Sequence, residues 1–242
     1  MTLCSELLIS VRNQEEFDAV LHSRVDVIDL KEPHNGPLAP ADLAVLRHAA
    51  DVFCRSKQQH GVLSAALGER TQALEVAAKI PAEFAYAKVG PSGCQTEESL
   101  LQLWGKVRAK LSPAIELVAV AYADHENAGS LDPMSVFAAA SKAGLRRCLI
   151  DTYCKDGRTT LDHLGIAGLQ EIMRLSREQR LWWAMAGSIR EDQVRPIWAA
   201  DVQPDCFGVR GDVCEGSRTD SISVDRVRSW QDTLMSVCQE VA

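Results

Sequence analysis

Two lysines that end short apolar runs are the residues in this sequence best suited to carry chemistry. Lys31 closes the run VDVIDLK two positions after Asp29, and Lys88 lies near the end of FAYAKVG. Residues two apart share a face of a strand, so Asp29 and Lys31 point the same way. Burial and a second ammonium group both lower a lysine's pKa. A lysine that is partly neutral forms an imine with a carbonyl compound, and a second lysine can then move protons.

Polar residues and glycines also end the later apolar runs. In chain order they are Asp124, Asp151 with Lys155 four residues on, Gly187 with Ser188, and Arg210 with Gly211. The carboxylates are candidates to orient the lysine amines. The glycine-bearing ends, with Arg210 and Arg218 beside them, are candidates to bind phosphate through backbone N–H groups and guanidinium groups. Ordinary turn formation is the alternative for the glycines.

The elements that must position these residues are eight apolar runs separated by segments of helical periodicity. The predicted strands are 6–11, 25–31, 61–68, 84–90, 115–124, 147–152, 181–188 and 206–211. Alternating strands and helices imply a parallel sheet, and eight units match a (β/α)8 barrel, which typically has about 250 residues. No linker divides the chain, so we expect a single (β/α)8 TIM barrel over residues 1–242. An open doubly wound sheet is disfavoured because the first strand is not followed by G-x-G-x-x-G.

Side-chain alternation places Lys88 inside the predicted barrel. Lys88 shares a strand face with Phe84 and Tyr86, whereas small residues occupy the other face, which suits packing against helices. Active sites of such barrels lie at the C-terminal ends of the strands. The residues expected to share one inward layer, or neighbouring ones, are Lys31, Lys88, Asp151 and Arg210. The structural alternative is that the lysines only extend from strand ends to pair with carboxylates.

Composition excludes several classes of protein. A net charge of -7 and a pI near 5.4 argue against a nucleic-acid-binding surface. The longest apolar run, LVAVAYA, is too short to span a bilayer. The first ten residues lack the pattern of a secretory signal, so we expect a cytoplasmic protein without membrane contact. The alternating apolar and basic helix SLLQLWGKVRAKL leaves open a homo-oligomer.

The cysteines and histidines predict neither a metal site nor a disulfide framework. Eight cysteines are scattered along the chain without a C-x-x-C pair, and six histidines form no ligand cluster. Thiols stay reduced in the cytosol. We therefore expect mostly buried, reduced cysteines and no metal or other cofactor.

Six blocks occur in order across nearly the whole chain: DVIDLKEPHNGPL, YAKVG, AYAD, DTYCKDGRTTLD, AGSI and GVRG. In these blocks the sequence resembles the (5-formylfuran-3-yl)methyl phosphate synthase family of methanofuran biosynthesis. The resemblance implies a (β/α)8 barrel that condenses two molecules of glyceraldehyde 3-phosphate, a triose phosphate, into a furan phosphate with loss of phosphate and water. It implies a carbon–oxygen lyase that needs no cofactor.

The same resemblance implies roles for individual residues. The family's Schiff-base lysine matches Lys31, and its proton-transferring lysine matches Lys88. The aspartate before the first lysine matches Asp29, and DTYCKDG aligns the supporting Asp151 and Lys155. Two alternatives remain open: a Schiff-base aldolase or isomerase acting on another phosphosugar, and a barrel that binds phosphorylated metabolites without catalysis.

Overall fold

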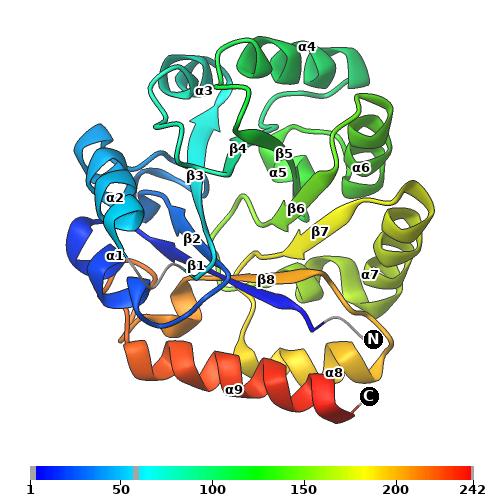
Figure 1. Ribbon diagram of the computed structural model, residues 1–242. Helices are drawn as coiled ribbons and strands as arrows, with labels where there is room; N and C mark the ends of the chain where they lie inside the picture. Colours follow the sequence, from blue (N-terminus) through cyan, green and yellow to red (C-terminus); the bar gives the residue numbers. More distant parts are fainter. Residues whose placement is uncertain (1–3, 57–59, 241–242) are drawn as a thin grey trace.

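The chain forms a closed barrel of eight parallel strands, in which each strand pairs with its neighbours in sequence order and β8 pairs with β1 (Figure 1). The computed structural model describes residues 4–56 and 60–240, so the predicted domain limits extend slightly beyond the described residues. The strands are β1 Glu6–Val11, β2 Val27–Leu30, β3 Val62–Glu69, β4 Tyr86–Gly90, β5 Glu116–Tyr122, β6 Arg147–Asp151, β7 Trp182–Met185 and β8 Cys206–Val209. The predicted TIM barrel is confirmed.

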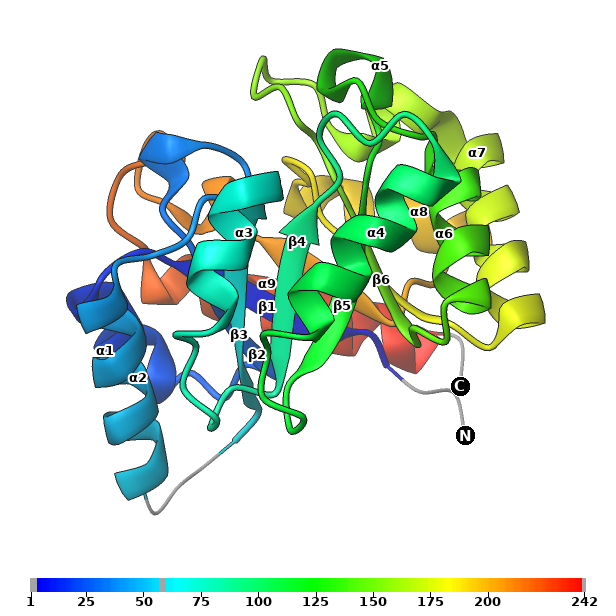
Figure 2. The same cartoon turned by 90° about the horizontal axis from the view of Figure 1, so that it is seen from above.

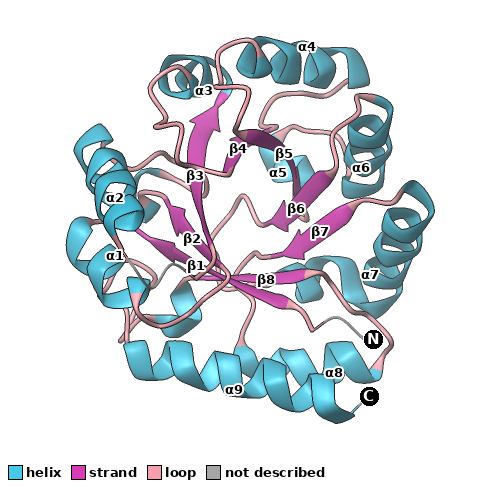
Figure 3. Ribbon diagram, viewed as in Figure 1, coloured by secondary structure: helices cyan, strands magenta, loops and turns pink. Residues whose placement is uncertain are grey.

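Helices surround the barrel and cover the outer face of its sheet (Figure 3). The α-helices are α1 Gln14–Leu21, α2 Leu43–Arg55, α3 Arg70–Ala77, α4 Glu97–Arg108, α5 His125–Ala128, α6 Pro133–Lys142, α7 Thr160–Gln179, α8 Val194–Ala199 and α9 Val224–Glu240. Short 3-10 helices lie at Pro33–Asn35, Glu191–Gln193 and Gly211–Val213. No helix of the described residues is long and apolar enough to cross a membrane.

The helices begin where side chains can satisfy free backbone N–H groups. The Thr96 side chain accepts a hydrogen bond from the Ser99 N–H, and the Ser99 side chain accepts one from the Thr96 N–H. These two bonds form a capping box at the start of α4. The Asp132 side chain caps α6 by accepting from the Ser135 N–H, and Pro133 occupies the first turn, where no N–H is needed. These caps fix where the chain leaves each strand-end loop.

Apolar side chains form two separate cores. The larger core lies between the sheet and the helices and includes Ala87 and Val89 of β4. The smaller core fills the barrel interior, where Tyr86 of β4 and Val27 of β2 pack. The predicted alternation along β4 is therefore confirmed from Tyr86 onward. Phe84 is an exception, because it precedes the strand and packs in the outer core.

A stacked cation fills the barrel interior at the N-terminal ends of the strands. The Arg147 guanidinium at the start of β6 lies 4.5 Å from the ring centroid of Tyr86 and 4.3 Å from that of Trp182. Its Nε also pairs with the Glu116 carboxylate at 3.2 Å. Stacking and ion pairing hold the Arg147 side chain in place at this end, and the C-terminal ends of the strands lie on the opposite side. Figure 2 shows that opposite side, toward which β4 points and where α5 lies.

The prediction of reduced cysteines is wrong for two residues. Cys4 and Cys238 form a disulfide, with their Cα atoms 5.4 Å apart although 234 positions separate them in sequence. Cys4 directly precedes β1 and Cys238 lies in α9, and the closed barrel brings these two segments together. Spacing along the chain could not reveal this proximity. Among the free cysteines, Cys94, Cys148, Cys206 and Cys214 are buried, as predicted.

Candidate active site

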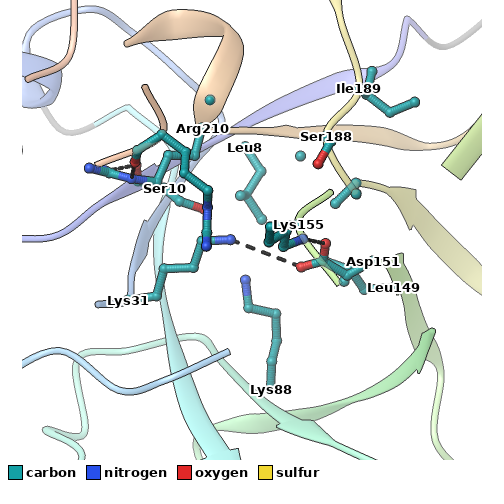
Figure 4. Close-up of a pocket in the computed structure, with 15 residues that line it drawn as sticks. Leu8, Ser10, Lys31, Lys88, Leu149, Asp151, Lys155, Ser188, Ile189 and Arg210 are labelled. Atoms are coloured by element: carbon teal, nitrogen blue, oxygen red, sulfur yellow. Dashed lines mark hydrogen bonds and ion pairs between the residues drawn. The ribbon is translucent and has the colours of Figure 1, made fainter. Parts of the chain in front are cut away.

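A pocket opens at the C-terminal ends of the strands, and most of the predicted site residues line it (Figure 4). The predicted residues that line the pocket are Lys31, Lys88, Asp151, Lys155, Gly187, Ser188, Arg210 and Gly211. Asp29 and Asp124 do not line it. In Figure 4, the side chains of Lys31 and Lys88 point into the same space, which Asp151 faces from the other side. The barrel thus brings together groups from β2, β4, β6, β7 and β8.

A buried carboxylate, that of Asp29, forms an ion pair with Lys88. Its Nζ lies 2.6 Å from Oδ1 of Asp29, and both side chains are almost fully buried. The other oxygen of Asp29 accepts a hydrogen bond from the Ser10 hydroxyl at 3.0 Å. Ser10, Asp29 and Lys88 come from β1, β2 and β4, so the barrel itself sets their geometry. The Lys88 ammonium is therefore fixed in place with its charge balanced.

Lys31 has no comparably close partner. The carboxylate oxygen nearest to its Nζ, in the part of the chain described, is Oδ2 of Asp151 at 4.0 Å. Burial lowers the pKa of Lys31 to about 8, since removing the ammonium from water costs more than the attraction of Asp151 returns, and Lys155 and Lys88 add repulsion. A larger fraction of the Lys31 amine is therefore neutral near pH 7 than in an ordinary lysine.

Asp151 joins the two sides of the pocket. Its Oδ1 accepts a hydrogen bond from the Lys155 Nζ at 2.7 Å and from the Thr152 N–H at 2.8 Å. Burial alone would raise its pKa, but the charges of Lys155 and Lys31 and these hydrogen bonds outweigh it and lower the pKa. The Lys155 Nζ also donates to the Thr152 hydroxyl at 2.9 Å. Lys155 is thus committed to Asp151, and a fixed negative charge faces Lys31.

The lowered pKa gives Lys31 a distinct pH profile. With a pKa of about 8, about a tenth of the amine is neutral at pH 7, against well under 0.1% for an ordinary lysine with a pKa near 10.4. Reductive trapping of a small aldehyde on Lys31 should therefore rise about tenfold per pH unit and level off above pH ~8. Mass spectrometry of each lysine after cyanoborohydride treatment measures this. The exposed Lys142 is the internal control, and a Lys31 profile still rising to pH 10 would contradict the prediction.

Arg210 lines the pocket, but its guanidinium N–H groups donate hydrogen bonds to other protein groups. Its Nη1 lies 2.8 Å from a carboxylate oxygen of Glu16 and also donates to the Ser10 carbonyl oxygen at 2.9 Å. Its Nε donates to the Arg218 carbonyl oxygen at 2.7 Å. Glu16 lies in α1 and is itself buried. Arg210 therefore ties β8 to β1 and α1 and fixes the loop that follows it.

Asp124 lies beside the pocket and organises its rim. Its carboxylate accepts hydrogen bonds from the backbone N–H groups of Tyr153 and Cys154, at 2.6 and 2.8 Å. The pKa of Asp124 is lowered, because these bonds and one from Asn127 outweigh the effect of its burial. The carboxylate holds the start of the loop that carries Lys155.

The backbone just after β7 leaves no space for a side chain at its first turn. Gly187 has a φ of +83°, and a Cβ there would meet the Thr160 hydroxyl and the Thr152 nitrogen. Ser188 also has positive φ, at 57°, and its side chain is exposed. This left-handed backbone turns the chain sharply away from β7.

Sequence reasoning missed three polar residues near the site. Ser10 and Glu16 support Asp29 and Arg210, and Glu69 is bonded by the buried Tyr122 hydroxyl and, at 2.9 Å, by the Ser92 N–H. The pKa of Glu69 is raised, chiefly by burial. Ser10 could have been noticed as a polar residue on the inward parity of β1, two places after Leu8. No comparable signal marks Glu16, which lies in a helix.

The described side chains do not form a group of three or more histidine, cysteine, aspartate or glutamate residues arranged to hold a metal ion. The pocket instead presents amines, the Asp151 carboxylate and the glycine-bearing ends of β7 and β8. This set of groups suits carbonyl chemistry by amines together with recognition of an anion.

Solved structures with the same architecture include several barrels. Phosphoribosyl anthranilate isomerase from Thermus thermophilus superposes with a TM-score of 0.63 at 13% identity, covering 96% of this chain and 99% of that one. (S)-3-O-geranylgeranylglyceryl phosphate synthase from Thermoplasma acidophilum gives a TM-score of 0.60 at 13% identity, covering 96% and 92%. At such low identity these likenesses show the fold alone.

Sequence comparisons are more specific. The model of the family described as 4-HFC-P synthase matches residues 7–231. Proteins named (5-formylfuran-3-yl)methyl phosphate synthase from Methanosarcina acetivorans and Methanosarcina barkeri are 31% and 32% identical to this chain, covering 97% of it and 99% of each relative. The protein from Archaeoglobus fulgidus with the same name is 29% identical over 92% of the chain and 96% of its own length. With the family model spanning β1 to α9, the chain belongs to the 4-HFC-P synthase family of enzymes.

Proposed function

We propose that the protein condenses two molecules of glyceraldehyde 3-phosphate to (5-formylfuran-3-yl)methyl phosphate through a Schiff base on Lys31. Atom balance requires the release of one phosphate and two molecules of water, which makes the protein a carbon–oxygen lyase. The product would serve the biosynthesis of methanofuran or a related furan cofactor. The names of the relatives support this product.

The observation that carries the proposal is the environment of Lys31. Its amine is buried, lines the pocket, has a pKa lowered to about 8 and lies 4.0 Å from its nearest described carboxylate oxygen. Attack of its Nζ on the C1 aldehyde of one triose expels water and leaves an iminium. Asp151 faces this position, so its carboxylate would stabilise the positive charge that the iminium carries.

The iminium then makes the next bonds easy to break. It withdraws electrons from C2, whose proton becomes removable, and the resulting enamine expels the phosphate from C3. Loss of phosphate leaves the C2 hydroxyl on a C2=C3 double bond, and this enol makes C3 nucleophilic. The second triose phosphate would first isomerise from aldehyde to ketone, with its C2 proton moved to C1 and its C2 hydroxyl proton moved to the C1 oxygen. The enol carbon C3 then adds to the ketone carbon. Loss of water, ring closure through oxygen with loss of a second water, and hydrolysis of the imine release the furan aldehyde and restore Lys31.

Lys88 would supply protons to this sequence. Its ammonium, fixed by Asp29 at 2.6 Å, would donate to the carbonyl oxygen of the second triose as the carbon–carbon bond forms. Lys155, held by Asp151, would keep that carboxylate ionised and in place. Phosphate of the retained triose would contact backbone N–H groups at Gly187, Ser188 and Gly211.

Incubation with glyceraldehyde 3-phosphate tests the proposal. We expect one inorganic phosphate per furan formed, together with furan absorbance and a product mass of two triose phosphates less one phosphoric acid and two waters. A trapped Lys31 adduct without furan would favour an aldolase or isomerase acting on another phosphosugar. The absence of both an adduct and phosphate release would refute the enzymatic proposal and would favour a barrel that binds phosphorylated metabolites without catalysis.

A further inference from the structure

The cations that line the pocket differ in what balances their charge. Lys31, Lys88, Lys155 and Arg210 each lie within 4.0 Å of a carboxylate oxygen. Arg218 also lines the pocket, and no carboxylate of the described residues comes that close to its guanidinium. Arg218 is thus the pocket cation that has no carboxylate oxygen within ion-pair distance among the described residues.

Arg218 is only partly solvated in this position. One nitrogen, Nη1, donates to the Pro33 carbonyl oxygen at 3.1 Å, and the remaining guanidinium donors have no hydrogen-bond partner in the described ranges. Burial lowers the pKa of Arg218, although a guanidinium keeps its proton at neutral pH. A charge that has lost part of its water without gaining a counter-ion is costly, so an anionic ligand would be favoured there.

The protein holds Arg218 in place through its neighbour in the loop. Arg210 donates from Nε to the Arg218 carbonyl oxygen, while its other nitrogens are pinned by Glu16 and Ser10. The loop also closes on itself, because the Ser217 N–H donates to the Asp220 carboxylate at 2.6 Å. The buried arginine therefore positions the half-buried one.

A serine without hydrogen-bond partners in the described part of the chain and two glycines line the same pocket as Arg218. Neither the hydroxyl nor the N–H of Ser188 has a hydrogen-bond partner among the residues that the structure describes, and Ser188 lines the pocket. A Cβ at Gly211 would lie 3.5 Å from that of Arg218, and one at Gly208 would lie 3.0 Å from that of Ala186. Gly208 and Gly211 line the same pocket as Ser188 and Arg218 and add no side chain to it.

We propose that Arg218 and Ser188 bind the phosphate group of the substrate, and that Arg210 positions Arg218 instead of contacting the phosphate itself. The inference rests on the proposed function only in taking the ligand to be a phosphate ester. A guanidinium can donate two parallel N–H bonds to a phosphate, and a neighbouring hydroxyl and N–H complete the shell of donors. The assignment replaces Arg210 by Arg218 as the charged phosphate ligand.

Calorimetric titration of the full-length protein with inorganic phosphate tests the role of Arg218. Loss of a charged hydrogen-bonding partner in Arg218→Gln should weaken phosphate binding by about 10- to 100-fold. Arg218→Lys should restore part of it, since an ammonium keeps the charge but not the paired donors. Arg174→Gln removes an exposed arginine that pairs with Glu178 and should bind as wild type does. Wild-type affinity in Arg218→Gln, or no phosphate binding by the wild type, overturns the proposal.

A variant cycle tests whether Arg210 acts through Arg218. Glu16→Gln accompanies Arg210→Gln in each variant, so that no buried carboxylate is left unpaired. This double variant should bind phosphate more weakly than wild type, and adding Arg218→Gln should weaken binding little further. A full additional loss on adding Arg218→Gln would mean that both arginines contact phosphate independently, against the positioning role.

The outcome is separable from that of the proposed reaction. Reductive trapping of unphosphorylated glyceraldehyde on Lys31 of the wild type reports the imine chemistry without any phosphate. Phosphate binding that depends on Arg218, in a protein that forms no furan, would sustain this inference and refute the proposed reaction. Furan formation, in a protein whose phosphate binding does not depend on Arg218, would sustain the proposed reaction and refute this inference.

Discussion

Replacing Lys31 by alanine is expected to abolish both the trapped adduct and furan formation. The variant lacks the amine that forms the imine, and removal of a covalent nucleophile typically costs several orders of magnitude, here about 10⁴-fold or more in turnover. Mass spectrometry after borohydride reduction with glyceraldehyde 3-phosphate should find the added mass on Lys31 of the wild type. The same treatment of Lys31→Ala should leave all peptides of the pocket unmodified.

A matched variant separates the loss of the nucleophile from the loss of charge. Lys31→Arg keeps a cation opposite Asp151, 4.0 Å from the native Nζ, but a guanidinium forms no imine. It should fold as the wild type does and be as inactive as Lys31→Ala. Furan formation by either variant at more than a hundredth of the wild-type rate would exclude an obligatory Schiff base on Lys31.

Lys88→Met is expected to have the second-largest effect, on both stability and turnover. The substitution leaves the Asp29 carboxylate, which is fully buried, without its cation. Breaking a buried ion pair from one side destabilises a protein by about 3–5 kcal/mol, and removing a general acid–base group slows turnover by about 10²- to 10⁴-fold. Chemical denaturation measures the first effect, and phosphate release from glyceraldehyde 3-phosphate measures the second.

The double variant Lys88→Met/Asp29→Asn distinguishes these two effects. Neutralising Asp29 removes the uncompensated charge and leaves its oxygen to accept from the Ser10 hydroxyl. Much of the lost stability should return, whereas turnover should stay low because no proton donor has been restored. Recovery of turnover together with stability would show that Lys88 serves the fold and not the chemistry.

The barrel and the lysine pair could be predicted because both follow from local pattern. Strand periodicity assigns Lys88 and Tyr86 to one face, and the parallel sheet brings the C-terminal ends of β2, β4 and β6 to one side. The pairing of Lys88 with Asp29 follows once the barrel closes. These steps need only the alternation of side chains and the order of strands.

The partners of the two loop arginines could not be predicted, because they depend on contacts far apart in sequence. Arg210 stands at the predicted strand end, but Glu16 lies 194 positions away in α1 and takes its guanidinium. The Pro33 carbonyl oxygen that accepts from Arg218 is 185 positions away. Sequence indicates which residues reach the rim, whereas tertiary packing decides which of them remain available to a ligand.

The bond between Cys4 and Cys238 changes the topology of the molecule as a polymer. With it, the chain from β1 into α9 forms one covalent macrocycle that contains all eight strands of the closed barrel. A cyclic polymer has no first strand: cutting it at another surface loop would yield the same eight strands in a rotated order, still covalently joined. Unfolding the oxidised protein releases a loop instead of a line, and so fewer disordered conformations compete with the fold.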